Sequence, residues 1–168
     1  MQERDDIMKL VTKFVCKFFK TDDIIRYVMN FDSELNDDEL DIIVKRICSS
    51  NNFTYIYWFS YVTKNLSEEN KRSLVNSVCK TNNPKFIYVY AKYIKDLSEE
   101  DKRTLKNAIK DLNDIEFIDK YALYVDESII LEKYKTIEEF HEHLNEVKNA
   151  KNNIKDNILN NKKYIYKI

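Results

Sequence analysis

Residues 51–81 read NNFTYIYWFSYVTKNLSEENKRSLVNSVCKT, and residues 82–112 read NNPKFIYVYAKYIKDLSEEDKRTLKNAIKDL. The two stretches follow each other without a gap and are identical at 13 of 31 positions. The same register extends upstream and downstream, where residues 31 positions apart again match: Ile25, Leu35, Val44 and Cys48, then Asn113, Phe117, Ile118, Tyr121, Ala122 and Val125. A fixed period of this length is typical of stacked supersecondary units.

The composition favours helices for these units. The chain of 168 residues contains no Gly and one Pro, and a repeat without them is hard to build from β-hairpins. With 43% hydrophobic residues the chain can bury a core. The many Lys, Asn, Ile and Tyr residues indicate an AT-rich genome.

Each unit reads as two helices. In the first, Ile56, Phe59, Ser60 and Thr63 recur at the spacing of one helical face. The second helix follows a Ser N-cap with acidic residues in its first turn, and Asn at its end tolerates a left-handed C-cap. Neither helix can bury its apolar side alone, so the sequence predicts stacked helical hairpins.

We therefore predict an all-α fold, an α-solenoid of about three 31-residue helical hairpins with N- and C-terminal capping helices. Residues 1–168 are expected to form a single domain. Its parts are an N-terminal capping helix at 1–19, repeats at 20–50, 51–81, 82–112 and in part 113–125, and C-terminal capping helices with a basic tail at 126–168. In the last part we predict a short helix at 127–134 and a long one at 137–160, capped by Thr136 and Glu139.

One motif links the chain to known repeats. It comprises Phe86-Ile87-Tyr88, Tyr90-Ala91, Leu105 and Asn107-Ala108-Ile109. In these residues the chain resembles α-solenoids of the HEAT and tetratricopeptide kind, and more closely the short tandem helical repeats of low-GC bacteria and their phages. The resemblance covers about residues 20–125. The repeat differs from the tetratricopeptide pattern in its length and in lacking the Gly of that pattern. The resemblance implies binding, without naming a ligand.

The residues that carry catalysis or bind metals elsewhere are sparse here. His141 and His143 diverge by about 200° around one helix, so they cannot chelate one metal ion together. A phosphate-binding Gly loop is excluded, and no Ser-His-Asp or Cys-His order is present. We expect no enzyme, no metal and no cofactor, and buried reduced thiols at Cys16, Cys48 and Cys79.

Candidate binding residues are those that differ between repeats at equivalent positions of the first helix. Two sets of equivalent positions meet this criterion, and both contain Tyr. Tyr is suited to contacts that are both apolar and hydrogen-bonding. The candidate partner-binding residues are Arg26, Asn30, Tyr57, Tyr61, Tyr88, Lys92 and Asp119. The alternative is that Tyr57 and Tyr88, being alike, pack between adjacent helices.

Basic residues form two further patterns. Arg72 and Arg103, each preceded by Lys, are expected to pair with Glu68 and Glu99 four residues earlier. The C-terminal end carries a basic patch that either contacts nucleic acid or an acidic partner, or reflects the codon composition. This patch contains Lys155, Lys162, Lys163 and Lys167.

Our leading hypothesis is a non-catalytic protein-binding module, an inhibitor of a host enzyme or immune complex made by a phage or mobile element. The alternatives are a nucleic-acid-binding helical repeat protein and a viral helical regulator of host signalling. The net charge of −1 and the absence of a signal-peptide pattern or long apolar run predict a cytoplasmic protein that does not bind membranes. We expect a monomer, or a weak dimer through the C-terminal helix.

Overall fold

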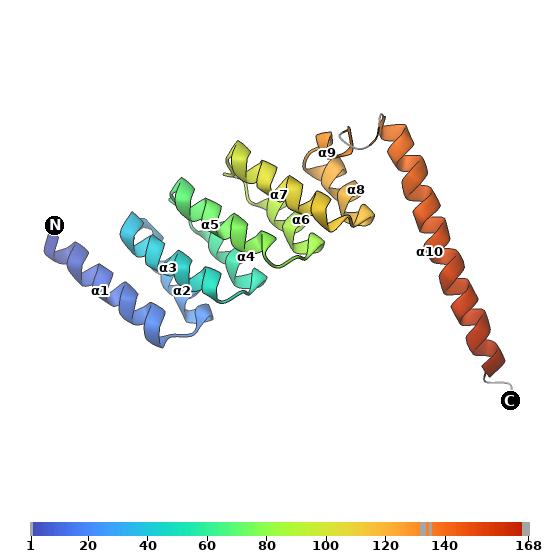
Figure 1. Cartoon of the computed structure of the whole chain (residues 1–168). Coiled ribbons are helices and arrows are strands. Elements are labelled where there is room, and N and C mark those ends of the chain that lie inside the picture. The colour runs from blue at the N-terminus through green and yellow to red at the C-terminus, as the bar shows by residue number, and fades with distance from the viewer. Residues whose placement is uncertain (1, 132–133, 135, 166–168) are drawn as a thin grey trace. The chain divides into compact units, whose positions relative to one another are not determined.

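The computed structural model describes residues 2–131, 134 and 136–165, and the regular structure in that part is helical throughout (Figure 1). No strand occurs among these residues, so the predicted all-α class is confirmed. The chain divides into two compact units, Met1–Asn113 and Asp114–Ile168. The expectation of a single domain stays a prediction.

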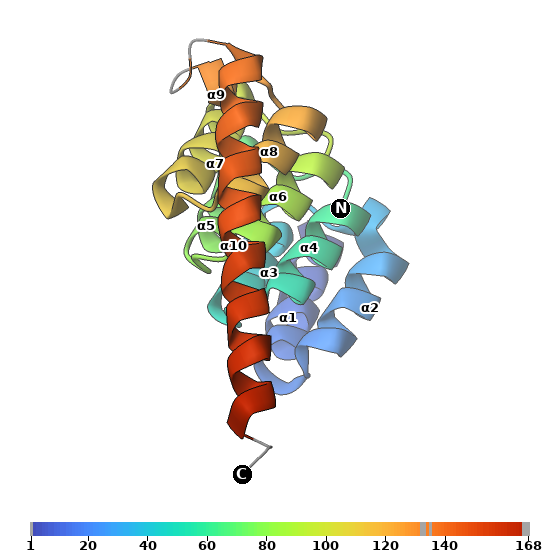
Figure 2. The same cartoon turned by 90° about the vertical axis from the view of Figure 1, so that its right-hand side faces the viewer.

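The first unit arranges its helices in two rows (Figures 1 and 2). In one row α1 packs on α3, α3 on α5, and α5 on α7; in the other, α2 packs on α4 and α4 on α6. A 3-10 turn at Asp32–Glu34 follows α2. The helices are α1 (Gln2–Phe18), α2 (Thr21–Phe31), α3 (Asp37–Ser49), α4 (Phe53–Val62), α5 (Glu68–Cys79), α6 (Pro84–Tyr93) and α7 (Glu99–Leu112).

The core of the first unit lies between the two rows and follows the 31-residue period. Three sets of side chains, each spaced by 31 residues, are 0% or 1% exposed. Each set places one residue on each of three successive helices of the same row. Positions that are equivalent in the sequence repeat are therefore buried at equivalent places in the structure. The sets are Val28, Phe59 and Tyr90; Ile43, Leu74 and Leu105; and Ile47, Val78 and Ile109.

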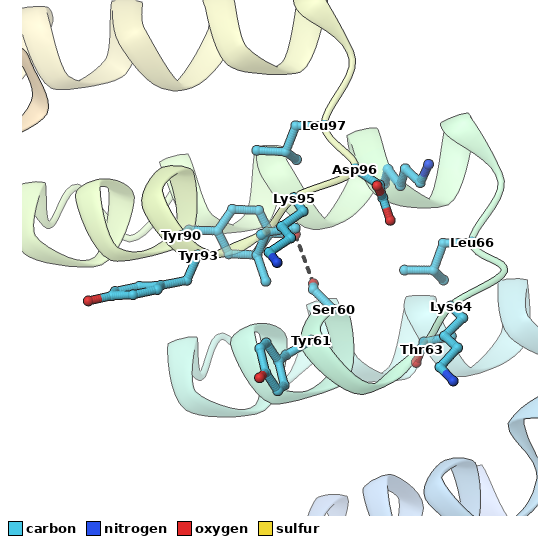
Figure 3. A pocket seen from close by; sticks show the side chains of 12 residues that line it. Ser60, Tyr61, Thr63, Lys64, Leu66, Tyr90, Tyr93, Lys95, Asp96 and Leu97 are labelled. Atoms are coloured by element: carbon cyan, nitrogen blue, oxygen red, sulfur yellow. Dashed lines mark hydrogen bonds between the residues drawn. The ribbon is translucent and has the colours of Figure 1, made fainter. Parts of the chain in front are cut away.

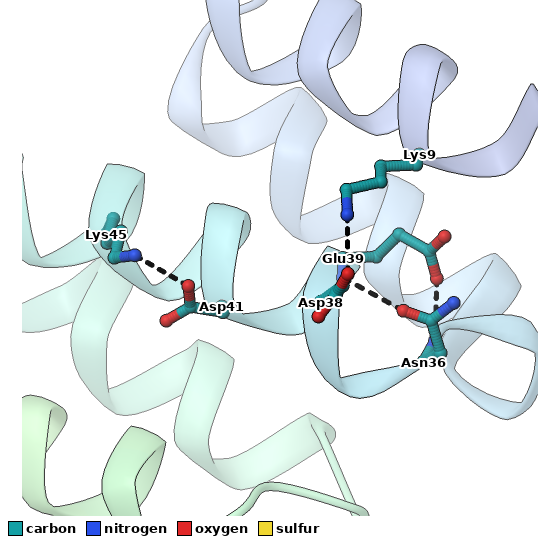
Figure 4. A network of polar contacts seen from close by, with 6 residues as sticks. All are labelled: Lys9, Asn36, Asp38, Glu39, Asp41 and Lys45. Atoms are coloured by element: carbon teal, nitrogen blue, oxygen red, sulfur yellow. Dashed lines mark hydrogen bonds and ion pairs between the residues drawn. The ribbon is translucent and has the colours of Figure 1, made fainter. Parts of the chain in front are cut away.

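The N-caps of α3, α5 and α7 repeat in the same register. Ser67 and Ser98 accept hydrogen bonds from the backbone N–H groups three residues on, at 3.2 and 3.1 Å, which confirms the predicted Ser caps. Asn36 takes this place in α3, and the Glu39 carboxylate in turn accepts from the Asn36 backbone N–H at 2.7 Å (Figure 4). This reciprocal capping box satisfies two backbone donors that the helix itself leaves unpaired.

Asn provides the left-handed turns that Gly supplies in most proteins. Asn51, Asn82 and Asn113 have φ values of 49°, 50° and 51°, and each directly follows a repeat's second helix or its last turn. The short polar side chain of Asn tolerates this conformation better than other non-Gly residues do. The predicted left-handed conformation is therefore confirmed at all three positions, although only Asn113 is itself a C-cap; Ser50 and Lys80 are the C-caps of α3 and α5.

Ion pairs fix the helices of the first row to one another. Lys9 Nζ lies 2.5 Å from Asp38 Oδ2 of α3 (Figure 4). Arg4 contacts Glu34, which lies just before α3, at 2.6 Å. The Lys9–Asp38 hydrogen bond raises the pKa of the lysine and lowers that of the carboxyl group. Such exposed pairs add little stability but hold the orientation of a helix.

The predicted pairing of Arg72 with Glu68 is wrong in detail. Lys71 contacts Glu68 at 2.9 Å and Lys102 contacts Glu99 at 2.6 Å, three residues apart on the same helix. Arg72 instead reaches across to Glu100 of α7. The arginine thus joins neighbouring repeats, because α5 and α7 lie side by side.

The second unit contains α8 (Ile115–Tyr124), α9 (Ser128–Leu131) and α10 (Ile137–Ile165). The short helix begins one residue later than predicted, and the long helix extends beyond its predicted end at residue 160. Its core includes Tyr121, Ile129 and Phe140, all at most 2% exposed. Thr136 Oγ1 accepts from the Glu139 N–H at 3.1 Å, as expected of an N-cap. None of the helices described is both long and apolar enough to cross a membrane.

The left-handed Asn positions give a first test. Replacing Asn82 with Val should lower the free energy of unfolding by about 1–2 kcal/mol, since a β-branched residue with positive φ brings its Cβ against the backbone. Replacing Asn82 with Gly should leave it nearly unchanged. Urea denaturation followed by circular dichroism measures both, and equal midpoints for the two variants would show that the left-handed turn is not required.

Candidate functional site

Aromatic side chains gather along α4 and α6. The rings of Phe53 and Phe86 stack across the two helices with centroids 4.3 Å apart and planes 2° from parallel. On α4, the Tyr57 and Tyr61 rings stack at 6.0 Å, and the Trp58 ring meets Tyr61 edge-on at 6.0 Å. We define the aromatic strip as Phe53, Tyr57, Trp58, Tyr61, Phe86 and Tyr93.

Much of the aromatic strip is open to solvent. Tyr61 is 60% exposed, and Trp58 and Tyr93 are each 48% exposed. The cause is local: α4 reads FTYIYWFSYV and is apolar on every side, while only Ile56 and Phe59 are buried in the core. Rings on the remaining sides of the helix therefore face water.

A cavity of about 260 Å³ lies at the C-terminal ends of α4 and α6 (Figure 3). On one wall the Tyr90 hydroxyl lies 2.8 Å from Ser60 Oγ, which also donates to the Ile56 carbonyl at 2.8 Å. Thr63 is 6% exposed, and its hydroxyl oxygen has no hydrogen-bond partner among the residues described. The other lining residues are Tyr61, Lys64, Leu66, Lys71, Tyr93, Ile94, Lys95, Asp96 and Leu97.

One position beside the cavity differs between the repeats. Asp32, Thr63 and Ile94 are 31 residues apart. The Asp32 carboxylate accepts from the Lys64 backbone N–H at 3.5 Å and so links the first repeat to the second. Thr63 has a shorter side chain, and its hydroxyl oxygen makes no equivalent bond. Thr63 and Ile94 both line the cavity, which is formed by residues of the second and third repeats.

Lys92 and Tyr57 keep their usual protonation states near neutral pH. Lys92 Nζ donates to the Tyr88 hydroxyl at 3.1 Å and lies 5.3 Å from the centre of the Tyr93 ring. That hydrogen bond raises the pKa of Lys92, which therefore stays charged. Burial, with smaller contributions from Tyr61 and Tyr93, raises the pKa of Tyr57, which stays neutral. The strip therefore offers phenolic hydroxyls beside the charged Lys92, and Lys64, Lys71 and Lys95 line the neighbouring cavity.

The predicted binding residues fall into three groups. Tyr57 and Tyr61 lie together on α4, and Tyr88 and Lys92 lie together on α6, which packs on α4. Tyr57 and Tyr88 are half-buried, so both also contribute to packing. The third group lies on other helices. Arg26 and Asn30 are exposed on α2, and Asp119 is part of α8 in the second unit, where its Oδ1 lies 3.9 Å from His141 Nε2.

The predicted basic patch falls on the end of α10 and beyond. The backbone of Lys155, Lys162 and Lys163 is helical, whereas their side chains and the whole of Lys167 lie outside the described residues. The patch therefore stays a prediction.

Sequence reasoning missed most members of the aromatic strip. Trp58 could have been found, because Tyr27 and Val89 occupy the equivalent positions and the site was sought among positions that vary. The stacking of Phe53 on Phe86 could not have been found in this way. These residues are 33 positions apart, so a comparison in the 31-residue register does not align them.

All three cysteines are unpaired thiols. Cys16 is buried, as expected, but Cys48 and Cys79 are only partly buried, because they lie at the ends of α3 and α5. Burial raises the pKa of Cys16 and of Cys79 to about 11, and it also raises that of Cys48. The thiolate, which is the reactive form, is therefore scarce at neutral pH.

Thiol reactivity tests this assignment. In native protein at pH 8, Cys16 and Cys79 should react with iodoacetamide much more slowly than in urea, as peptide mass spectrometry can measure for each residue. Since both folded-state pKa values exceed the unfolded value, their contribution to stability is present below about pH 9 and is lost as the pH rises towards 11. Equal native and unfolded rates at pH 8 would contradict the assignment.

Comparison of the chain with protein-family models, curated proteins and solved structures finds no match. The resemblance to tandem helical repeats therefore depends on the residues alone.

Proposed function

We propose that residues 21–112 form an α-solenoid of three helical hairpins, α2–α3, α4–α5 and α6–α7, which binds another protein through the aromatic strip. The 31-residue period of buried positions supports the solenoid, as does the packing of each helix on the helix one repeat further along. Arrays of this kind expose the surface of one row for binding. In this chain that surface is the row of α2, α4 and α6.

The observation that carries the proposal is the exposure of Trp58, Tyr61 and Tyr93. Each ring is about half or more exposed, and the first two are held in place by edge and stacking contacts on α4. Trp and Tyr dominate the energetics of protein interfaces, because a rigid ring buries a large area at a small cost in conformational entropy. A preformed group of this kind suits a protein surface.

The neighbouring cavity narrows the chemistry of the partner. Its volume of about 260 Å³ is small for an organic cofactor but large enough for one side chain. Leu66 and Leu97 supply apolar walls, and Lys64, Lys95 and Asp96 supply charged groups. We infer that the partner covers the aromatic strip and inserts one side chain that is apolar in its stem and polar at its tip.

The inhibitory role, the phage or mobile-element origin and the low-GC repeat type stay predictions of the sequence. Nucleic-acid binding remains the alternative, since bases also stack on exposed rings. Two lysines near the strip have partners on their own helices: Lys92 donates to Tyr88, and Lys71 contacts Glu68 at 2.9 Å. Lys64 and Lys95 also line the cavity, so the salt dependence of binding has to decide between a protein and a phosphate backbone.

Affinity capture from the source cells tests the proposal. Any captured protein, identified by mass spectrometry and purified, should bind the Trp58→Ala/Tyr61→Ala variant at least about tenfold more weakly than the wild type. The matched control is Arg103→Ala/Asn107→Ala, which removes two exposed side chains from α7 in the other row. Equal affinities for the wild type and the strip variant would refute the assigned surface.

Trp58 provides a direct signal, because it is the only tryptophan of the chain and belongs to the strip. Binding of the partner should protect its fluorescence from quenching by acrylamide. Single-stranded oligonucleotides should leave that fluorescence unchanged. If they quench it instead, with an affinity that falls steeply between about 50 and 200 mM salt, the nucleic-acid alternative is correct.

A further inference from the structure

Helix α1 has an apolar side that faces solvent. The inner side is buried: Thr12 is 0% exposed and lies 3.1 Å from the Tyr27 hydroxyl, and Arg46 of α3 donates to the Cys16 carbonyl at 3.2 Å. In Figure 1 α1 is the first helix of its row, so no further helix of the first unit covers the other side. We define the α1 outer face as Ile7, Leu10, Val11, Phe14 and Phe18, whose exposures are 57%, 69%, 40%, 55% and 63%.

The α1 outer face is more apolar than is usual for the first helix of a repeat array. Terminal helices of repeat proteins normally carry polar outer faces. Given the areas of large apolar side chains, the five residues here present on the order of 500 Å² of contiguous apolar surface. A patch of that size on a soluble protein usually marks an interaction site.

Charged residues along one edge of the face identify its occupant. Asp6, Lys13 and Lys17 are exposed and lie within about 40° of one another around the helix axis, beside Leu10. The acidic residue is near the N-terminal end and the basic residues are nearer the C-terminal end. Lys9 and Arg4 do not add to this edge, because Asp38 and Glu34 already hold them.

We propose that two copies of this chain pair through their α1 outer faces as an antiparallel, twofold-symmetric dimer. The twofold axis lies perpendicular to α1 at the level of residues 11 and 12. This axis reverses the direction of the second α1 and places the charged edges of both copies on the same side of the interface. Asp6 then faces Lys17 of the partner subunit, and the second Asp6–Lys17 pair forms by symmetry. A parallel twofold pair would place the two charged edges on opposite sides of the interface, so Asp6 and Lys17 would meet only in the antiparallel form.

The size of the interface predicts a reversible dimer. Two such faces bury roughly 1,000 Å² in total, below the range of stable protein complexes and in the range of weak ones. Area alone does not set affinity, but five apolar side chains per copy with two exposed ion pairs are consistent with association in the micromolar range. Measurements therefore have to cover about 1 to 300 µM protein.

Sedimentation velocity of the full chain tests the proposal. The sedimentation coefficient should rise with concentration from a monomer to a dimer value. Phe14→Asp should abolish that rise, while circular dichroism and Trp58 emission stay unchanged because Phe14 is exposed. The matched control is Ile154→Asp on α10, an equally exposed apolar residue at 59%, which should dimerise as the wild type does.

A charge exchange tests the antiparallel register. Asp6→Lys and Lys17→Asp should each weaken dimerisation about threefold or more, because each variant opposes like charges in both pairs. An equimolar mixture of the two variants should recover the association, since the mixed dimer contains two Lys–Asp pairs. Raising the salt concentration should reduce these differences.

The results that would overturn the proposal are distinct. A monomer at every concentration would exclude the dimer. Loss of the dimer with Ile154→Asp and not with Phe14→Asp would place it on the C-terminal helix instead. A mixture that associates no better than either charge variant alone would exclude the antiparallel register. The Trp58→Ala/Tyr61→Ala variant should dimerise normally, so failure of the protein-binding proposal would be seen separately.

Discussion

Burial of apolar side chains between two rows of short helices is the interaction on which the first unit depends. Helices of 10 to 14 residues, the lengths of α3 to α7, are marginal in water when isolated. Each becomes stable by packing on the helix one repeat away, through positions such as Phe59 and Tyr90 that are fully buried. Stability is therefore shared between neighbours, and the surface positions are left to vary.

Features set by neighbouring residues could be predicted from the sequence. The Ser67 and Ser98 caps and the left-handed Asn82 depend on the chemistry of a few residues close in the chain, and the 31-residue period showed each of them more than once. Contacts between different repeats were harder to predict from the sequence. Arg72 contacts Glu100 rather than Glu68, because the nearer partner in space lies on the adjacent helix and not one turn away.

The same distinction explains what was found of the candidate site. Tyr57 and Tyr61 were identified as positions that vary between repeats, and the structure places them side by side with ring centroids 6.0 Å apart. The cavity was not anticipated, because its walls come from residues of two repeats that lie far apart in the sequence. Thr63 stands where Asp32 makes a bond between repeats, and only the geometry shows that its hydroxyl is left without a partner.

The two proposed surfaces lie on different rows of the first unit. The α1 outer face belongs to the row of α1, α3, α5 and α7, and the aromatic strip belongs to the row of α2, α4 and α6. Dimerisation through α1 would therefore leave both strips exposed, one on each copy. A twofold dimer with two strips binds a partner that is itself dimeric or repetitive with an avidity that neither strip has alone, because the second contact forms at a high effective concentration. Weak self-association would thus strengthen binding to such a partner without any further contact at the strip.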